Sequence, residues 1–114
     1  MPPTLLPDFN NTTSLSEEVQ KLIPDAHVVK TWNTMNAGLM VNPSMLQDPG
    51  TIFLSGNSAE GKATVKGLLE KVGWKHILDL GDITSARGAE QVVILWVRIW
   101  GALGTPLFNF KIVQ

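Results

Sequence analysis

The chain has 114 residues, of which 44% are hydrophobic and 17% are charged, and this predicts one small globular domain. Nine basic and ten acidic residues give a net charge of -1, which excludes the strongly positive surface that general nucleic-acid binding requires. The lack of cysteine excludes disulfides, thiolate metal sites and a cysteine nucleophile. No secretory signal and no membrane-spanning stretch is present, so we expect a cytoplasmic protein without nucleic-acid or membrane partners.

The first third of the chain predicts a lead-in, one helix and one strand. Residues 1–13 hold three prolines and no periodic pattern, which is typical of an irregular lead-in or linker. Ser14 and Glu17 have the spacing of a capping box, and the apolar residues that follow favour a helix over Leu15–Ile23 with one apolar face. The β-branched and aromatic run His27–Trp32 predicts a strand.

The middle of the chain predicts a strand, helix and strand in succession. Residues 33–50 are rich in turn formers and predict a loop with at most a short helix near Asn36–Met40. Strands are expected over Thr51–Ser55 and Ile77–Leu80. Between them Ala59–Val72 has the clearest amphipathic helical pattern. Its apolar face consists of Val65, Leu68, Leu69 and Val72.

The last third predicts a long helix from Thr84, apolar on nearly all sides over Val92–Leu103. Such a helix belongs in a core or at a contact between subunits. Leu107–Val113 is a candidate closing strand. Strands that alternate with helices indicate an α/β fold with a partly parallel sheet of three to four strands.

One short motif matches a phosphate-binding loop. The stretch Gly56–Lys62 fits G-x-x-x-x-G-K and lies between a predicted strand and a predicted helix, and Asp79 resembles the second, magnesium-binding element. However, Ala63 stands where that motif places a magnesium-binding Ser or Thr. The alternative is an ordinary turn in which Asn57 or Ser58 caps the following helix.

Other common motifs are missing. No predicted strand is followed by G-x-G-x-x-G, so the chain lacks the fingerprint of a dinucleotide site. His27 and His76 are far apart in sequence, and each has a single carboxylate nearby, so we expect no metal site.

A first polar cluster, Lys30–Ala37, follows the end of a predicted strand. In open α/β sheets ligands bind beyond the carboxyl ends of strands, and Asn and Thr offer neutral groups suited to a carboxamide or a flavin-like ring edge. The alternative is an Asn-rich turn.

A second polar cluster, Gly81–Arg87, opens the predicted long helix. Free backbone N–H groups at a helix start favour anions, and Arg87 could add a charge-assisted hydrogen bond to a phosphate or carboxylate. In the alternative interpretation Asp82 or Thr84 caps the helix and Arg87 pairs with Glu90.

These clusters belong to a set of motifs spread over nearly the whole chain. The set comprises Met1–Ser14, Val28–Ala37, Gly56–Ser58, Asp79–Arg87 and Gly101–Lys111. In order and spacing the set resembles the carboxyl-terminal half of the NADP oxidoreductases that depend on the deazaflavin coenzyme F420, a family related to the reductase domains of the STEAP metalloreductases.

The resemblance implies a partial Rossmann-like, three-layer fold in which residues 14–114 complete the sheet and wall the cofactor cleft. It implies hydride transfer, with NADP and either F420 or a flavin as cofactors, and an amino-terminal half that holds the glycine-rich NADP site. By position, the family's catalytic pair falls on Asn33 and Thr34, which would orient the reacting rings. The implied cofactor contacts are Met35, Asn36, Ala37, Thr84, Ser85 and Arg87.

The resemblance also implies that this chain is incomplete on its own, because it begins where the family's first half ends. An incomplete gene product, an excised domain and a subunit whose partner chain holds NADP are all consistent with this start. Two other function classes stay open. One is a dimerisation module, a homo-oligomer built on Val92–Leu103, and the other is a phosphate-loop nucleotide binder.

Overall fold

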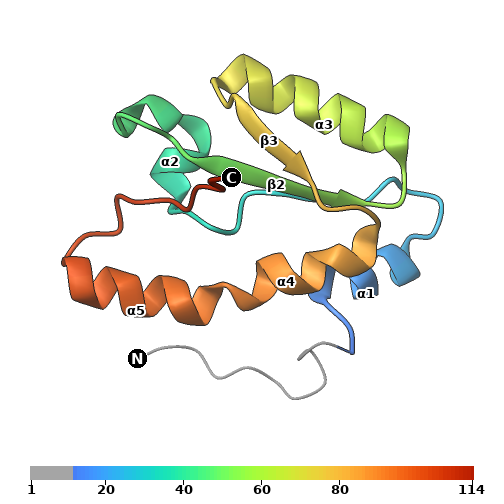
Figure 1. Ribbon diagram of the computed structural model, residues 1–114. Coiled ribbons are helices and arrows are strands. Elements are labelled where there is room, and N and C mark those ends of the chain that lie inside the picture. The colour runs from blue at the N-terminus through green and yellow to red at the C-terminus, as the bar shows by residue number, and fades with distance from the viewer. Residues whose placement is uncertain (1–11) are drawn as a thin grey trace.

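A mixed three-stranded sheet forms the middle layer of the computed structural model, which describes residues 12–114 (Figure 1). The strands are β1 (Val29–Lys30), β2 (Thr51–Gly56) and β3 (His76–Asp79), in the spatial order β1-β2-β3. β2 and β3 are parallel, whereas β1 runs antiparallel to β2. The α/β class with a partly parallel sheet is confirmed. The predicted lead-in lies, up to residue 11, outside the described residues.

Helix α3 (Ala59–Val72) connects the two parallel strands and covers one face of the sheet. Its bounds are those that the sequence predicts. Ser58 caps it, since the side chain accepts a hydrogen bond of 2.9 Å from the Gly61 amide. Gly73, at a φ of 121°, ends it in a conformation that other residues rarely adopt.

The opposite face of the sheet is covered by a short 3-10 turn, η3 (Ile83–Ser85), and by α4 (Ala86–Gln91), with α1 (Leu15–Leu22) packed against both (Figure 1). Helix α5 (Val93–Leu103) continues beyond the sheet. The prediction of one long helix from Thr84 is therefore wrong in detail. The amide of Val92 bonds the Ala89 carbonyl three residues back, and this tighter turn separates α4 from α5.

Helix α1 has the predicted start but the opposite orientation. Ser14 accepts a hydrogen bond from the Glu17 amide, as a capping box requires. The buried residues of α1 are nevertheless Ser16 and Glu17, while its apolar side chains face outward, with Leu22 81% exposed. The reason is that α4 presents charged partners to the polar face of α1.

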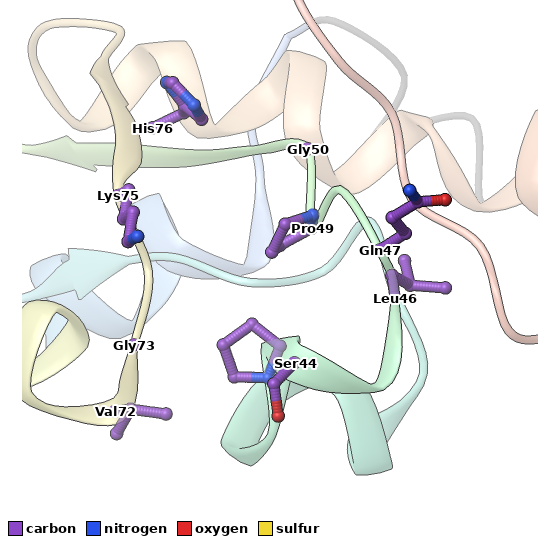
Figure 2. A pocket seen from close by; sticks show the side chains of 10 residues that line it. Ser44, Leu46, Gln47, Pro49, Gly50, Val72, Gly73, Lys75 and His76 are labelled. Atoms are coloured by element: carbon purple, nitrogen blue, oxygen red, sulfur yellow. The ribbon is translucent and has the colours of Figure 1, made fainter.

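β1 is shorter than the predicted strand over His27–Trp32. Trp32 and Asn33 have φ values of 61° and 64°, in the left-handed region that non-glycine residues avoid. These two residues turn the chain out of the sheet. The chain then forms α2 (Ala37–Val41) and a 3-10 turn, η2 (Pro43–Met45), and it returns to β2 past a hollow at the amino end of the sheet (Figure 2).

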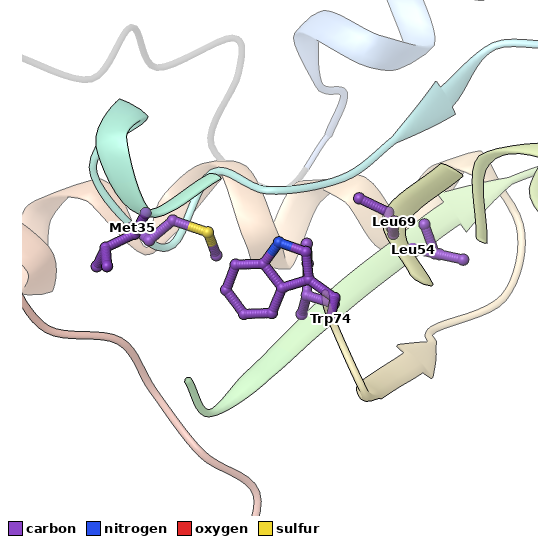
Figure 3. Close-up of a cluster of buried hydrophobic side chains, with 6 residues drawn as sticks. Met35, Leu54, Leu69 and Trp74 are labelled. Atoms are coloured by element: carbon purple, nitrogen blue, oxygen red, sulfur yellow. The ribbon is translucent and has the colours of Figure 1, made fainter. Parts of the chain in front are cut away.

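The hydrophobic core lies between α2, α3 and the sheet (Figure 3). Trp74, which follows α3, is its largest side chain and is 2% exposed. Its indole N–H donates a hydrogen bond of 3.0 Å to the Met40 carbonyl, so the ring is buried without an unsatisfied donor. The rest of this core comprises Met35, Leu39, Ile52, Leu54 and Leu69.

The tail Leu107–Val113 is extended but does not form the predicted closing strand. One backbone bond, from the Thr51 amide to the Phe110 carbonyl at 2.8 Å, fixes it to β2. The Asn109 side chain donates to the carbonyls of Pro49 and Thr51, and the Ile112 amide donates to Thr51 Oγ1 at 3.0 Å. Bonds that involve side chains thus replace the regular ladder. Within residues 12–114 no helix is long and apolar enough to cross a membrane.

Candidate functional site

The loops that follow β2 and β3 meet at the carboxyl edge of the parallel pair. The Gly56 amide donates to the Gly81 carbonyl at 3.1 Å, and the Ile83 amide donates to Asn57 Oδ1 at 3.0 Å. Open α/β sheets bind ligands at strand ends of this kind, so this edge is a candidate ligand site.

Four polar side chains gather there, and we call Ser55, Asp82, Thr84 and Ser85 the carboxyl-edge cluster. Ser85 Oγ lies 2.7 Å from Ser55 Oγ and 2.6 Å from the Asp82 carbonyl oxygen. Since one hydroxyl donates a single proton, Ser85 donates to Asp82 and accepts from Ser55. Thr84 is exposed, and its hydroxyl donates to Asp82 Oδ1.

Asp82 caps the turn that opens α4, in agreement with one of the two predicted capping residues. Its carboxylate accepts a hydrogen bond of 3.0 Å from the Thr84 amide. The hydrogen bonds from the side chain and the backbone of Thr84 lower the pKa of Asp82 below its ordinary value of 3.8. Asp82 is therefore a carboxylate at neutral pH, with no proton to give to a substrate.

Arg87 also lies at this edge, where it forms a two-pronged ion pair with Glu17 of α1. Nη2 and Nε of Arg87 lie 2.7 and 2.9 Å from the two carboxylate oxygens. The hydrogen bond from Arg87 lowers the pKa of Glu17, and the bond from Glu17 raises the pKa of Arg87. Sequence analysis missed Glu17 as the partner, because it is evident there only as a member of the capping box.

The predicted pairing of Arg87 with Glu90 is wrong. Glu90 instead accepts hydrogen bonds from the backbone amides of Leu15 and Ser16, at 2.8 and 3.1 Å, and from the Ser16 hydroxyl. The start of α1 thus satisfies Glu90, and Glu17 on the same helix satisfies Arg87. α1 and α4 are bound by charge rather than by apolar packing.

The first predicted cluster lies largely elsewhere, because β1 is antiparallel to β2. Its exit therefore points to the amino end of β2 rather than to the carboxyl edge. Thr34 is 0% exposed and donates to Asn109 Oδ1 at 2.8 Å, beside the start of β2. Met35 belongs to the core. Asn36 caps α2 through the Leu39 amide, and Ala37 is exposed at the first turn of that helix.

Asn33 connects the two regions. Its side-chain amide donates to the Ala89 carbonyl of α4 at 2.5 Å, and its Oδ1 accepts a hydrogen bond from Lys30 Nζ at 3.1 Å. The structure thus brings Thr84, Ser85 and Arg87 together, places Thr34 to Ala37 at the far end of the sheet, and leaves Asn33 between them.

The loop that resembles a phosphate site is filled by its own contacts. Lys62 Nζ lies 2.9 Å from Asp79 Oδ2 and donates to the Gly81 carbonyl at 3.1 Å. The bond from Lys62 lowers the pKa of Asp79. A Cβ at Gly61 would lie 2.8 Å from Cβ of His27, so close packing explains this glycine. These contacts favour the turn interpretation, with Ser58 as the cap.

The cavities on the part of the chain that the structure describes include four of about 250–520 Å³. The cavities of about 520 and 400 Å³ lie beside His27 and Ser58, and beside Lys75 and His76 (Figure 2). The smaller cavities, of about 280 and 250 Å³, flank α3 on its two sides. None of the four is lined by Asn33, Thr34 or Arg87. Residues 12–114 hold no cluster of three or more metal-ligating side chains.

Comparison with known proteins finds similar chains among solved structures. No protein-family model and no curated protein matches the chain. Four chains of solved structures match, and one of them is the crystal structure of a "putative F420 dependent NADP-reductase" from Arthrobacter sp. FB24. It is 54% identical to this chain and superposes with a TM-score of 0.94.

That match covers 100% of this chain and 51% of the Arthrobacter chain, so the chain spans about half the length of its relative. The partial Rossmann-like fold is therefore confirmed. The resemblance of the chain to the F420-dependent NADP oxidoreductases is likewise confirmed by this match.

Proposed function

We propose that the chain is the carboxyl-terminal, cofactor-cleft half of an oxidoreductase that transfers hydride between NADP(H) and F420 or a flavin. The observation that supports this is the match to the Arthrobacter protein, at 54% identity over the whole chain. When bound, F420 or a flavin would supply the ring that takes up hydride from the reduced nicotinamide. The protein's part is to hold the two rings together and to exclude water.

The carboxyl-edge cluster is suited to the neutral part of such a cofactor. Thr84 is exposed, and its hydroxyl oxygen, whose proton goes to Asp82 Oδ1, can accept a hydrogen bond from a carboxamide N–H. Ser85 lies behind it, fixed by Ser55 and Asp82. We assign cofactor contact to Thr84, with Ser85 as its support.

The other residues of the predicted site are suited to positioning. Thr34 has no exposed surface, and Met35 is a core residue, so neither reaches a ring. Asn33 ties the exit of β1 to α4. Arg87 holds α1 through Glu17, so we assign it to positioning the edge rather than to binding an anionic tail.

The phosphates of the nucleotide do not fit this chain's edge. The three cations of the candidate motifs are already paired, Lys30 with Glu90, Lys62 with Asp79 and Arg87 with Glu17. We therefore assign phosphate binding to the half of the enzyme that this chain does not span.

The test is hydride transfer with and without the complementary half. The pure chain, mixed with NADPH and F420, is expected to show no sustained NADPH oxidation. Co-expression with the part of the Arthrobacter protein that it does not cover should give an assembly that oxidises NADPH. Sustained turnover by the chain alone would contradict the proposal that this chain needs the complementary half for catalysis. An assembly that does not oxidise NADPH would contradict the proposed oxidoreductase function.

A matched pair of variants tests the residue assignment in that assembly. Thr84→Val removes the exposed hydroxyl and should lower kcat/KM about tenfold, the effect of losing one good hydrogen bond to the transition state. Thr64→Val removes a hydroxyl that bonds only the Glu60 carbonyl on the surface of α3, and it should leave kcat/KM unchanged. Equal rates for the two variants would remove Thr84 from the site.

We also propose that α5 forms a contact between two copies of the chain. None of its residues is buried, and Leu95 and Leu103 are 55% and 59% exposed. Trp96 Nε1 is buried and has no hydrogen-bond partner among the described residues. An unsatisfied donor of this kind is rare within a complete fold, which is consistent with a contact at this surface.

The absence of cysteine supports residence in the cytoplasm.

A further inference from the structure

β3 is the outermost strand of the sheet on the side away from β1 (Figure 1). Within residues 12–114 it pairs only with β2, so its outer backbone groups have no strand to bond. Parallel strands are usually covered on both faces. In β3, however, three of the four residues are exposed, and only Ile77 is half-buried. The strand is therefore an open edge without a cover among the described residues.

The backbone of β3 determines which residues present hydrogen-bonding groups at this edge. The Leu80 amide donates to the Leu54 carbonyl of β2 at 2.8 Å. Successive residues of a strand direct their N–H and C=O groups to opposite sides, so Ile77 and Asp79 face the open side. Lys75, one position before the strand, continues this alternation. The open edge thus offers donors and acceptors at every second residue, with Ile77 at the centre.

Opposite charges flank Ile77 at equal spacing along the chain. Lys75 lies two residues before it, and Asp79 lies two residues after it. Lys75 is exposed, and no ion pair within residues 12–114 includes it. Asp79 pairs with Lys62, but its side chain is 52% exposed and can accept a second cation. One end of the edge therefore offers a cation and the other end offers an anion.

We propose that the open edge of β3 pairs antiparallel with β3 of a second copy, about a two-fold axis at Ile77. Each Ile77 then faces its counterpart, and Lys75 of each copy faces Asp79 of the other. This register aligns the outward backbone groups of both copies and allows about six ladder bonds. An axis at Leu78 would instead set Ile77 opposite Asp79 and would leave Lys75 without a carboxylate.

The symmetry of the charges identifies a second copy as the partner. A strand with a cation and an anion equally spaced from its centre matches its own antiparallel copy at both ends, because opposite charges directly across a strand pair are stabilising. The contact is separate from the one proposed on α5, and it does not depend on hydride transfer. Four residues of strand form a weak contact by themselves, so β3 should supplement the α5 contact rather than replace it.

A single cysteine at the proposed axis tests the register, because the chain has no cysteine of its own. In the proposed pairing the two Cα atoms of residue 77 lie about 5.5 Å apart, within the range that a disulfide spans. The two Leu78 residues are diagonal neighbours at about 7–8 Å, which is too far. With diamide as the oxidant, Ile77→Cys should therefore form a disulfide-linked dimer about tenfold faster than Leu78→Cys.

The comparison is demanding because exposure acts against the expected result. Leu78 is 40% exposed and Ile77 is only half-buried, so random collisions would favour cross-linking of Leu78→Cys. The circular dichroism of both variants should match that of the parent chain, since each keeps a small apolar side chain at its position. Equal rates, or faster cross-linking of Leu78→Cys, would overturn the proposed contact.

Charge reversal in the Ile77→Cys chain gives a second measurement. Lys75→Glu sets two carboxylates opposite each other at both ends of the pairing and should slow cross-linking about fivefold. Lys71→Glu, at an exposed position on α3, makes the same change in net charge and should leave the rate unchanged. A rate that does not respond to Lys75→Glu would also overturn the contact. Neither measurement involves NADPH, so the proposed function is tested separately.

Discussion

The core around Trp74 and helix α5 both consist largely of apolar residues, but only the core is enclosed. Trp74, Leu39 and Leu69 are at most 2% exposed, and each packs against α2, α3 or the sheet. None of the residues of α5 is buried, and its Trp96 packs beside Phe108 with ring centroids 5.3 Å apart.

The two regions differ in whether their polar groups have hydrogen-bond partners and whether their apolar surface is covered. The core satisfies its polar groups internally, as the bond from the Trp74 indole to Met40 illustrates. α5, by contrast, leaves apolar side chains exposed, and the indole N–H of Trp96 has no partner within residues 12–114. Contiguous exposed apolar surface of this kind is typical of contact sites.

The largest expected effect is a loss of stability when a core tryptophan is removed. Trp74→Ala leaves a large cavity and an unpaired Met40 carbonyl, and it should lower the free energy of unfolding by about 3–5 kcal/mol. Trp100→Ala, at a side chain that is 45% exposed, should cost about 1 kcal/mol or less. Urea denaturation of both variants checks this, and equal losses would end the distinction between the two regions.

A smaller effect is expected where the core holds the tail. Thr34→Val removes the hydroxyl that donates to Asn109 Oδ1 and leaves that oxygen without its donor. The free energy of unfolding should fall by about 1–2 kcal/mol. Amide exchange in residues 109–112 should rise. Thr64→Val, on the surface of α3, is the control and should change neither quantity.

The ion pair between α1 and α4 predicts a dependence of stability on pH. Arg87 lowers the pKa of Glu17 in the folded state below the ordinary 4.5, so the pair stabilises the fold above that pH. This contribution is lost as the pH falls below 4.5 toward the lower folded value. Glu17→Gln should therefore weaken the fall in the free energy of unfolding with decreasing pH below 4.5. Glu70→Gln, which removes an exposed carboxylate without a described partner, should leave this pH dependence as it is in the parent chain.

The smallest change in stability is expected on α5, where assembly should respond instead. Leu95→Lys combined with Leu103→Lys affects side chains that are already more than half exposed, so the free energy of unfolding should change by less than about 0.5 kcal/mol. Light scattering should show the parent chain as an oligomer and the double variant as a monomer. A parent that stays monomeric at high concentration would remove the proposed contact.

Elements specified by local signals could be predicted from the sequence. α3 is bounded by Ser58 and Gly73, and its prediction is confirmed at both ends. α1 begins at its capping box for the same reason. The sequence could not show that Leu107–Val113 is not a strand. The tail is held instead by side-chain bonds from Asn109 to residues about sixty positions earlier.

The candidate site was less accessible to prediction than the fold. The pair of Arg87 and Glu17 joins residues 70 positions apart, and no local spacing indicates it. The expectation that Asn33 and Thr84 wall one cleft comes from the family resemblance, and no pattern in the sequence gives the direction of β1. The antiparallel direction of β1 separates them, and strand direction is a property of the whole sheet.

The capping of α1 by Glu90 has a consequence for synthesis of the chain. The amides of Leu15 and Ser16 bond a carboxylate that lies 75 and 74 positions later, and an isolated helix of eight residues is unstable in water. While the ribosome is still making β2 and α3, α1 has no acceptor for its first amides. The earliest helix in the chain is thus among the last to form, and nascent chains halted before Glu90 should show its backbone open to protease.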